Sequence, residues 1–252
     1  ADIGLEGLAE APAGAVRRIG PPGAGALLKG AEGHKYAHGH ALVLGGGPGR
    51  GGAARLAARA ALRIGAGLAT VGTPPAALQE NAARLDAVML RAVRDADALA
   101  SALEDPRITA VLIGPGHGVD DRTRAMAEVA LASGRAVVLD ADALTVLGAE
   151  IARFGRPGVV LTPHEGEFRR LFPEIDPQDD AVSRAQAAAA RLGGATLVLK
   201  GPATVVAEAG RGAALRSGLR AEAAPWLATA GSGDVLGGMI AGLLVVVLLL
   251  AA

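Results

Sequence analysis

Short apolar runs alternate with longer stretches rich in Ala, Arg and Leu along most of this 252-residue chain. A short run that is apolar throughout is typical of a strand buried on both faces, and strands that alternate with helices are joined by right-handed crossovers. The pattern therefore predicts an α/β fold with a mainly parallel sheet covered by helices. We expect strands at 41–44, 68–71, 109–113, 136–139, 158–161 and 196–199, and helices at 53–64, 121–132 and 179–192.

The core of such a fold must be built from small aliphatic side chains, because 51% of the residues are hydrophobic and only 2% are aromatic. The scarcity of aromatic rings argues against RNA-recognition modules and aromatic-lined sugar sites, which depend on stacking. Lys and Arg number 25, as do Asp and Glu, so the formal net charge is zero and nothing favours a nucleic-acid partner. The absence of cysteine excludes disulfides and thiolate nucleophiles and fits a reducing compartment.

Both ends of the chain depart from the alternating pattern. The first 30 residues are rich in Gly, Ala and Pro and lack the basic start and apolar core of a signal peptide, so we expect a linker or surface segment. The last residues, 235–252, carry no charge and reach the length of a membrane span. Three glycines interrupt this stretch and no anchor flanks it, so a buried helix is the better interpretation. Its uncapped run 245–250 predicts a domain that is incomplete at the C-terminus.

Glycines and the few special polar residues gather where the expected strands end. In a parallel sheet the ligand crevice lies beyond the carboxyl ends of the strands. The sequence therefore predicts a binding site at this edge of the sheet. The segments concerned are 45–52, 114–118, 140–142, 162–167 and 200–201.

The segment 47–52 fits the pattern G-x-G-x-x-G between a strand and a helix, as in dinucleotide-binding folds. The acidic residue that should follow about 20 positions later is missing, because the second strand runs into Gly72-Thr73-Pro74-Pro75. This argues against a hydride-transferring Rossmann dehydrogenase. A tight turn between strand and helix explains the glycines equally well.

A second possible phosphate cradle lies at 229–236, Thr-Ala-Gly-Ser-Gly-Asp-Val-Leu, where two glycines open a helix. No P-loop motif is present, but the unpaired N–H groups and positive dipole of a helix start can hold an anion. Asp234 lies in the first turn. It either complements the helix dipole or accepts the proton of an attacking hydroxyl while the amides hold a phosphoryl group.

Several charged residues at strand ends have two interpretations each. Lys200, one of three lysines against 22 arginines, is either solvated or faces a ligand held by the turn after it. His164 and Glu167 lack a third metal ligand, so the acidic residues there can simply favour a helix start. Asp140 and Asp142 either bind Mg²⁺ through water or cap a helix that begins near Ala143. Hydrolase motifs of the H-E-x-x-H and G-x-S-x-G types are absent.

Taken together, these segments resemble the ADP/ATP-dependent NAD(P)H-hydrate dehydratase family of the ribokinase-like superfamily. The match runs in order from about Lys29 to the last residues, which is more specific than any single motif. The chain differs from the family's usual residues at several positions. It has Gly47 where the family usually has Ser, His117 where it has Leu or Met, Thr145 where it has Asn, and Glu165 where it has Pro. Residues 224–227 stand where the family has Asn-Pro-Gly-Met. The segments that carry the resemblance are 45–55, 65–67, 114–118, 140–144, 162–167, 200–201 and 228–234.

The resemblance implies a ribokinase-like, three-layer α/β/α fold with a mainly parallel central sheet. It assigns 29–252 to the dehydratase domain and leaves 1–28 as a linker or the end of a preceding epimerase domain, since Ala1-Asp2-Ile3-Gly4-Leu5 resembles that end. It also implies a lyase that repairs hydrated NADH or NADPH. ADP or ATP phosphorylates the ring hydroxyl with the help of Mg²⁺, and elimination of phosphate follows. We expect a cytoplasmic homo-oligomer with no nucleic-acid or membrane partner.

Positions matching the family's motifs supply the expected site. Asp234 is the expected catalytic base and also contacts the substrate. The amides of 230–233 hold the transferring phosphoryl group. The hydrated dinucleotide is expected to contact Ala53, Gly116, Gly118 and His164. The nucleotide is expected to contact Lys200, Gly201, Pro202, Ala203, Thr204, Gly231, Ser232 and Gly233.

Three other functions are compatible with parts of this sequence. A kinase of a small hydroxylated metabolite would use Asp234 in the same way, but the motifs at 114–118 and 162–167 favour the dehydratase. A non-catalytic nucleotide-binding module would not need Asp234. A Rossmann dehydrogenase would need the acidic residue that is missing.

Overall fold

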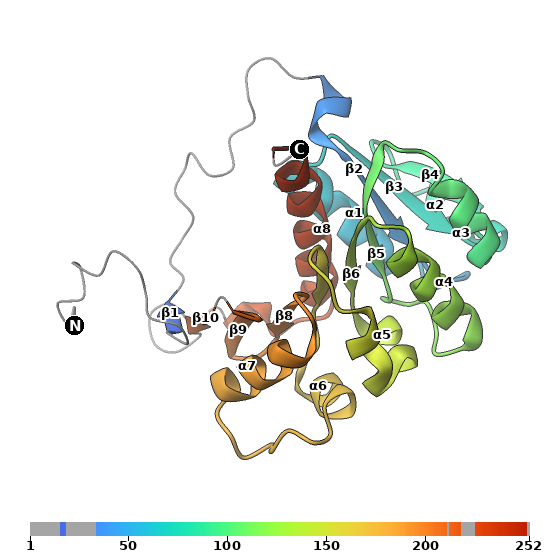
Figure 1. The fold of residues 1–252 in the computed structure, drawn as a ribbon. Coiled ribbons are helices and arrows are strands. Elements are labelled where there is room, and N and C mark those ends of the chain that lie inside the picture. The colour runs from blue at the N-terminus through green and yellow to red at the C-terminus, as the bar shows by residue number, and fades with distance from the viewer. Residues whose placement is uncertain (1–15, 19–33, 211, 218–224, 251–252) are drawn as a thin grey trace.

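The computed structural model describes residues 16–18, 34–210, 212–217 and 225–250, and its strands form one sheet (Figure 1). The strands are β1 (Val16–Arg18), β2 (His40–Leu44), β3 (Leu68–Thr73), β4 (Met89–Ala92), β5 (Ile108–Ile113), β6 (Ala136–Leu139), β7 (Val159–Leu161), β8 (Thr196–Leu199), β9 (Ala203–Glu208) and β10 (Gly212–Ser217). Their order across the sheet is β1-β10-β9-β8-β7-β6-β5-β2-β3-β4.

The sheet is parallel from β4 through β8, and β9 is antiparallel to both of its neighbours. The prediction of a mainly parallel sheet is therefore confirmed. The antiparallel part follows from the short turn between β8 and β9, which leaves no room for a crossover helix. Of the first 28 residues, the structure describes only β1, which pairs in parallel with β10.

Helices cover both faces of the sheet, which gives the expected three layers (Figure 1). The helices are α1 (Gly52–Ile64), α2 (Leu78–Ala82), α3 (Ala96–Ala102), α4 (Asp121–Ala132), α5 (Ala141–Leu147), α6 (Glu165–Leu171), α7 (Ala181–Arg191) and α8 (Ser232–Leu250). Alternate strand residues face opposite layers: Val43, Leu112 and Val138 pack with α1 and α8, whereas Val111 and Val137 pack with α3 to α7. The larger core cluster is on the second face.

Helices α1 and α8 pack with their backbones close together, which explains the small residues in both. A Cβ atom on Gly238 would lie 2.1 Å from the Ala57 carbonyl oxygen, and one on Gly242 would lie 2.7 Å from that of Ala61. The expected helix in the last 18 residues is thus present and packs against α1 through its glycines. Within the described part of the chain, no helix combines the length and the hydropathy that a membrane crossing requires.

Candidate functional site

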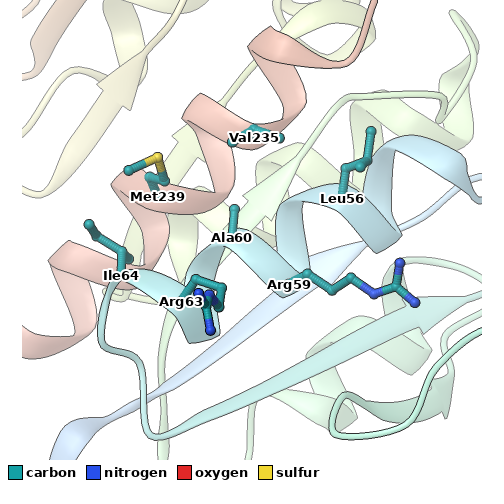
Figure 2. Close-up of a pocket in the computed structure, with 7 residues that line it drawn as sticks. All are labelled: Leu56, Arg59, Ala60, Arg63, Ile64, Val235 and Met239. Atoms are coloured by element: carbon teal, nitrogen blue, oxygen red, sulfur yellow. The ribbon is translucent and has the colours of Figure 1, made fainter.

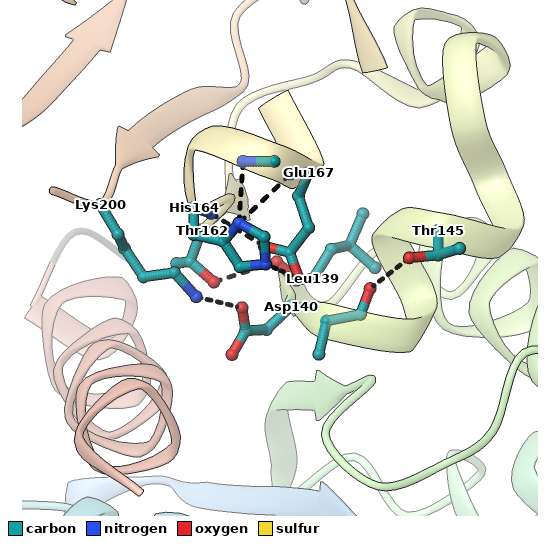
Figure 3. Close-up of polar contacts among 9 residues, drawn as sticks. Leu139, Asp140, Thr145, Thr162, His164, Glu167 and Lys200 are labelled. Carbon is teal, nitrogen blue, oxygen red and sulfur yellow. Dashed lines mark hydrogen bonds and ion pairs between the residues drawn. The ribbon is translucent and has the colours of Figure 1, made fainter. Parts of the chain in front are cut away.

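Lys200 and Asp140 form an ion pair at the edge of the sheet where β6 and β8 end. The Lys200 ammonium donates a hydrogen bond to Asp140 Oδ1 at 2.7 Å, and Figure 3 shows the two side chains pointing toward one another. The Asp140 side chain is 4% exposed and that of Lys200 is 21% exposed. The interpretation of Lys200 as a solvated lysine is therefore wrong, because a buried carboxylate holds its charged end.

Asp140 occupies the cap position of α5 but does not cap it with its side chain. The capping interpretation is wrong as well, because the carboxylate turns to Lys200 instead of the helix amides. The next residue, Ala141, is the one non-glycine residue in the described chain with a positive φ, 46°. This left-handed conformation costs about 1–2 kcal/mol for a residue with a Cβ. Strain thus lies directly beside the buried carboxylate.

Asp234 lies in the first turn of α8 and is partly buried. Burial raises the pKa of its carboxyl, the negative charge of Asp140 raises that pKa further, and the positive charge of Lys200 lowers it in part. The three charged groups therefore lie close enough to act on one another. A carboxylate with a raised pKa holds a proton more firmly, which suits a general base.

The start of α8 forms an open anion cradle beside Lys200. Gly231 has a φ of +91°, and a Cβ on it would lie 2.8 Å from Leu56 Cδ1, so glycine is required there. A Cβ on Gly233 would lie 3.6 Å from Lys200 Nζ. The Ser232 N–H donates to the Thr229 carbonyl oxygen at 3.3 Å and so is already bonded. The positive end of the helix dipole remains, and the ammonium adds positive charge beside it. The phosphate site at this helix start stays a prediction, with which the glycines and the nearby ammonium are compatible.

The turn from Lys200 to Thr204 joins β8 to β9 next to this cradle. The Lys200 N–H donates to the Pro163 carbonyl oxygen at 2.8 Å, which ties the end of β8 to the end of β7. The Thr204 hydroxyl donates to the Gly201 carbonyl oxygen at 3.2 Å. Gly201 and Pro202 are exposed. Backbone groups of the expected nucleotide site are therefore accessible.

Two loops on the expected substrate side are packed against each other. A Cβ on Gly46 would lie 1.9 Å from the Gly116 carbonyl oxygen, so the loop 45–52 and the loop 114–118 touch through backbone. The Asp142 carboxylate accepts a hydrogen bond from the Gly118 N–H at 2.8 Å. Asp142 therefore positions the second loop. Ala53 lies in the first turn of α1, which starts at the end of the first loop.

Glu80 accepts a hydrogen bond from an amide of the glycine-rich loop. This contact was not predicted from the sequence. Its carboxylate accepts a hydrogen bond from the Gly49 N–H at 2.6 Å and another from Arg55 at 3.2 Å. These two bonds hold the pKa of Glu80 below its usual value. Glu80 lies 31 residues beyond Gly49, and no spacing in the sequence signals the contact.

His164 and Glu167 form a capping box at the start of α6. His164 Nδ1 accepts hydrogen bonds from the N–H groups of Gly166 and Glu167, and the Glu167 carboxylate accepts the His164 N–H at 2.8 Å (Figure 3). The pair thus caps the start of α6. The His164 side chain remains 56% exposed and accessible to a ligand. The described residues contain no group of three or more potential metal ligands.

His117 is buried in the loop 114–118, and neither ring nitrogen has a hydrogen-bond partner in the described structure. Burial lowers the pKa of His117 to about 4, Arg122 lowers it further, and Asp142 and Asp120 oppose the shift. The ring is therefore neutral near pH 7.

A hollow of about 300 Å³ lies between α1 and α8, and its lining includes Val235, the residue after Asp234 (Figure 2). Apolar side chains and two arginines form its walls, so it lacks the acceptor and donor set that phosphoryl transfer needs. The lining residues are Leu56, Arg59, Ala60, Arg63, Ile64, Val235 and Met239.

Comparisons of the sequence with known proteins identify the family. The family model described as NAD(P)H-hydrate dehydratase matches residues 41–251. The chain is 36% identical over 214 residues to a bifunctional NAD(P)H-hydrate repair enzyme of Coxiella burnetii, covering 84% of this chain and 42% of that protein. It is 34% identical to the ADP-dependent (S)-NAD(P)H-hydrate dehydratase of Streptococcus pneumoniae, covering 83% of this chain and 71% of that protein. The chain therefore spans about two-fifths of the length of the bifunctional relative.

Solved structures show the same fold. A ribokinase-like superfamily protein of Enterococcus faecalis matches with a TM-score of 0.76 and 28% identity, over 91% of this chain and 80% of the other. The ADP/ATP-dependent NAD(P)H-hydrate dehydratase of Bacillus subtilis, co-crystallised with ATP and Mg²⁺, matches with a TM-score of 0.70 and 30% identity, over 87% and 76%. With its ribokinase-like fold and a match over most of its length, the chain belongs to the NAD(P)H-hydrate dehydratase family.

Proposed function

We propose that this chain catalyses the nucleotide-dependent dehydration of hydrated NADH or NADPH. The observation that carries the proposal is the position of Asp234, in the first turn of α8 beside the Lys200–Asp140 ion pair. A helix start and an ammonium group together stabilise a transferring phosphoryl group, and the neighbouring carboxylate accepts a proton. Membership of the family supports the substrate class.

In the proposed reaction, Asp234 removes the proton of the ring hydroxyl as its oxygen attacks the terminal phosphorus of ADP or ATP. The bond from that phosphorus to the bridging oxygen breaks, and AMP or ADP leaves. The hydroxyl has then become a phosphate ester, which is a better leaving group. In the elimination the carbon–oxygen bond breaks and inorganic phosphate leaves with its electron pair. The adjacent ring carbon loses a proton to water, and the electrons of that carbon–hydrogen bond restore the ring double bond. Positioning and charge stabilisation supply most of the catalysis in such transfers.

Mg²⁺ fits this site as an ion that arrives with the nucleotide. Mg²⁺ in phosphoryl-transfer sites is held mainly by substrate phosphates, water and one or two carboxylates, so the lack of a three-ligand group in the described chain does not oppose it. When bound, the ion neutralises charge on the phosphates. We assign no residue as its protein ligand.

The remaining site residues are proposals of the same kind. The hydrated dinucleotide contacts Ala53, Gly116, Gly118 and His164, whose loops lie together at one edge of the sheet. The nucleotide contacts the turn 200–204 and the amides of 231–233. We also propose that residues 29–252 belong to the dehydratase domain, which the family match at 41–251 supports.

A turnover assay tests the proposal. Purified protein is mixed with hydrated NADH, Mg²⁺ and either ADP or ATP, and the return of the dihydronicotinamide absorbance is followed. We expect recovery only with a nucleotide, and a loss of about 10²–10⁴-fold in rate for Asp234→Asn, since the general base is removed. A folded protein that binds ADP but gives no recovery would contradict the dehydratase and favour a kinase of a small hydroxylated metabolite.

A further inference from the structure

Asp140 is a buried carboxylate with one side-chain hydrogen bond in the described structure, the bond to Lys200 at 2.7 Å. Two features fix its backbone. Ala141 follows it in a left-handed conformation, and a Cβ on Gly114 would lie 1.7 Å from the Asp140 carbonyl oxygen. Backbone strain of this kind persists only where the surroundings enforce it. The backbone of Asp140 is therefore fixed where β5 and β6 end, and its buried side chain has only two rotatable bonds.

The partner of this rigid carboxylate is a flexible side chain. A lysine side chain has four rotatable bonds and many rotamers, so its charge has no fixed position by itself. In this structure the ammonium lies near Gly233, at the open end of α8. A charge that is already in place when the phosphate arrives needs no reorganisation during the reaction.

We propose that Asp140 is a positioning residue, which holds the Lys200 ammonium at the start of α8 so that it meets the terminal phosphate of the nucleotide. This inference rests on the proposed function, because it assigns a task to the same site.

A double-mutant cycle tests whether Asp140 acts through Lys200. Asp140→Asn keeps the shape of the side chain and removes its charge, and we expect kcat to fall about 10²-fold because misplaced groups cost about that much. In a Lys200→Met background the same substitution is expected to change kcat less than about threefold, since the group to be positioned is gone. Equal losses in both backgrounds would overturn the proposal.

Folding is monitored in the same set of variants. Lys200→Met leaves Asp140 buried without its partner, which is destabilising. The double variant, with a neutral amide at position 140, is expected to melt at a higher temperature than Lys200→Met alone. The comparison separates loss of fold from loss of positioning, and a double variant no more stable than the single one would contradict the ion pair.

An NMR readout does not depend on activity. The chain has three lysines, Lys29, Lys35 and Lys200, so the side-chain ammonium region is simple to assign with Lys200→Met as the reference. In Asp140→Asn we expect the Lys200 signal to shift and the Lys35 signal to stay. Calorimetry with ADP and Mg²⁺ should show binding about tenfold weaker. An unmoved Lys200 signal with unchanged ADP binding would reject the positioning role, whether or not hydrated NADH is a substrate.

Discussion

His117 shows how one buried side chain can set the acid sensitivity of the fold. The folded protein binds a proton on this ring only near pH 4, whereas the unfolded chain does so near pH 6.5. Its contribution to stability is therefore complete above pH 6.5 and is lost as the pH falls toward 4. By linkage the loss amounts to about 3 kcal/mol at pH 4.

We expect His117→Leu to reduce this loss. The free energy of unfolding, measured with urea between pH 7 and pH 4, should fall less steeply in the variant than in the parent protein. Burial also lowers the pKa of His40. His40 affects the unfolding free energy of both proteins equally, so its effect cancels when the two curves are compared. Parallel curves for the two proteins would show that the ring at position 117 is not the group responsible.

The partners of individual site residues were only partly predictable from the sequence. Lys200 could be singled out because it is a rare lysine at the end of an apolar strand. Its partner Asp140 could not be predicted, because it lies 60 residues earlier in the chain. The two residues come together only because of the order of the strands in the sheet. The contact between Glu80 and Gly49 could not be predicted for the same reason. A sequence shows which residues are unusual, but contacts between distant segments depend on the folded register.

At the scale of elements, the packing of α8 on α1 depends on single glycines. A Cβ at position 238 would meet the Ala57 backbone, which cannot move aside, so Gly238→Ala should lower the free energy of unfolding by about 1–3 kcal/mol. Gly237→Ala is a matched control on the same helix. Its Cβ would meet only the side chain of Leu112 at 3.3 Å, and alanine is the better helix former.

Urea unfolding of the two variants tests whether the close contact between α1 and α8 depends on Gly238. Gly237→Ala should match or exceed the stability of the parent, while Gly238→Ala should unfold at lower urea concentration. Similar values for both would mean that the two helices can separate without cost.

The glycine-rich loop provides a second prediction at this scale, which rests on the proposed substrate. Glu80→Ala removes the carboxylate that holds the Gly49 N–H and Arg55, so the loop should become less ordered. We expect the KM for hydrated NADH to rise several-fold with little change in kcat, because binding is affected more than chemistry. Glu104→Ala, at an exposed glutamate outside the site, is the control. A fall in kcat at unchanged KM would contradict a role in holding the substrate loop.

The elements themselves were largely predictable where burial is complete. Strands β2, β5, β6 and β8 lie where the apolar runs predict them, because both faces of each strand are covered. Edge strand β4 was missed because it is short and mostly exposed, and Arg91 interrupts its apolar residues. The hairpin of β9 and β10 was missed for a related reason: β9 alternates between buried and partly exposed residues.

At the scale of the whole molecule, the fold brings three charged groups close together. Two of them follow the ends of strands, and the third lies at the start of a helix. Asp140 follows β6, Lys200 follows β8, and Asp234 begins α8, which packs across β5 and β6. The crossover rule predicts the shared edge, because all parallel strands point the same way. A nucleotide bound there therefore contacts several elements that come together only in the folded state.

Binding to the folded state alone must raise the melting temperature. At a concentration of ADP and Mg²⁺ about 100 times the dissociation constant, the gain is about 2.7 kcal/mol, or roughly 5–10 °C for a chain of this size. Lys200→Met should lose most of that shift, because it removes the positive charge beside the phosphate cradle. Asp234→Asn should keep it, since the variant lacks the base but retains the amides and the ammonium. A shift that survives in Lys200→Met would place the nucleotide elsewhere on the molecule, and one lost in Asp234→Asn would mean that the carboxylate serves binding more than proton transfer.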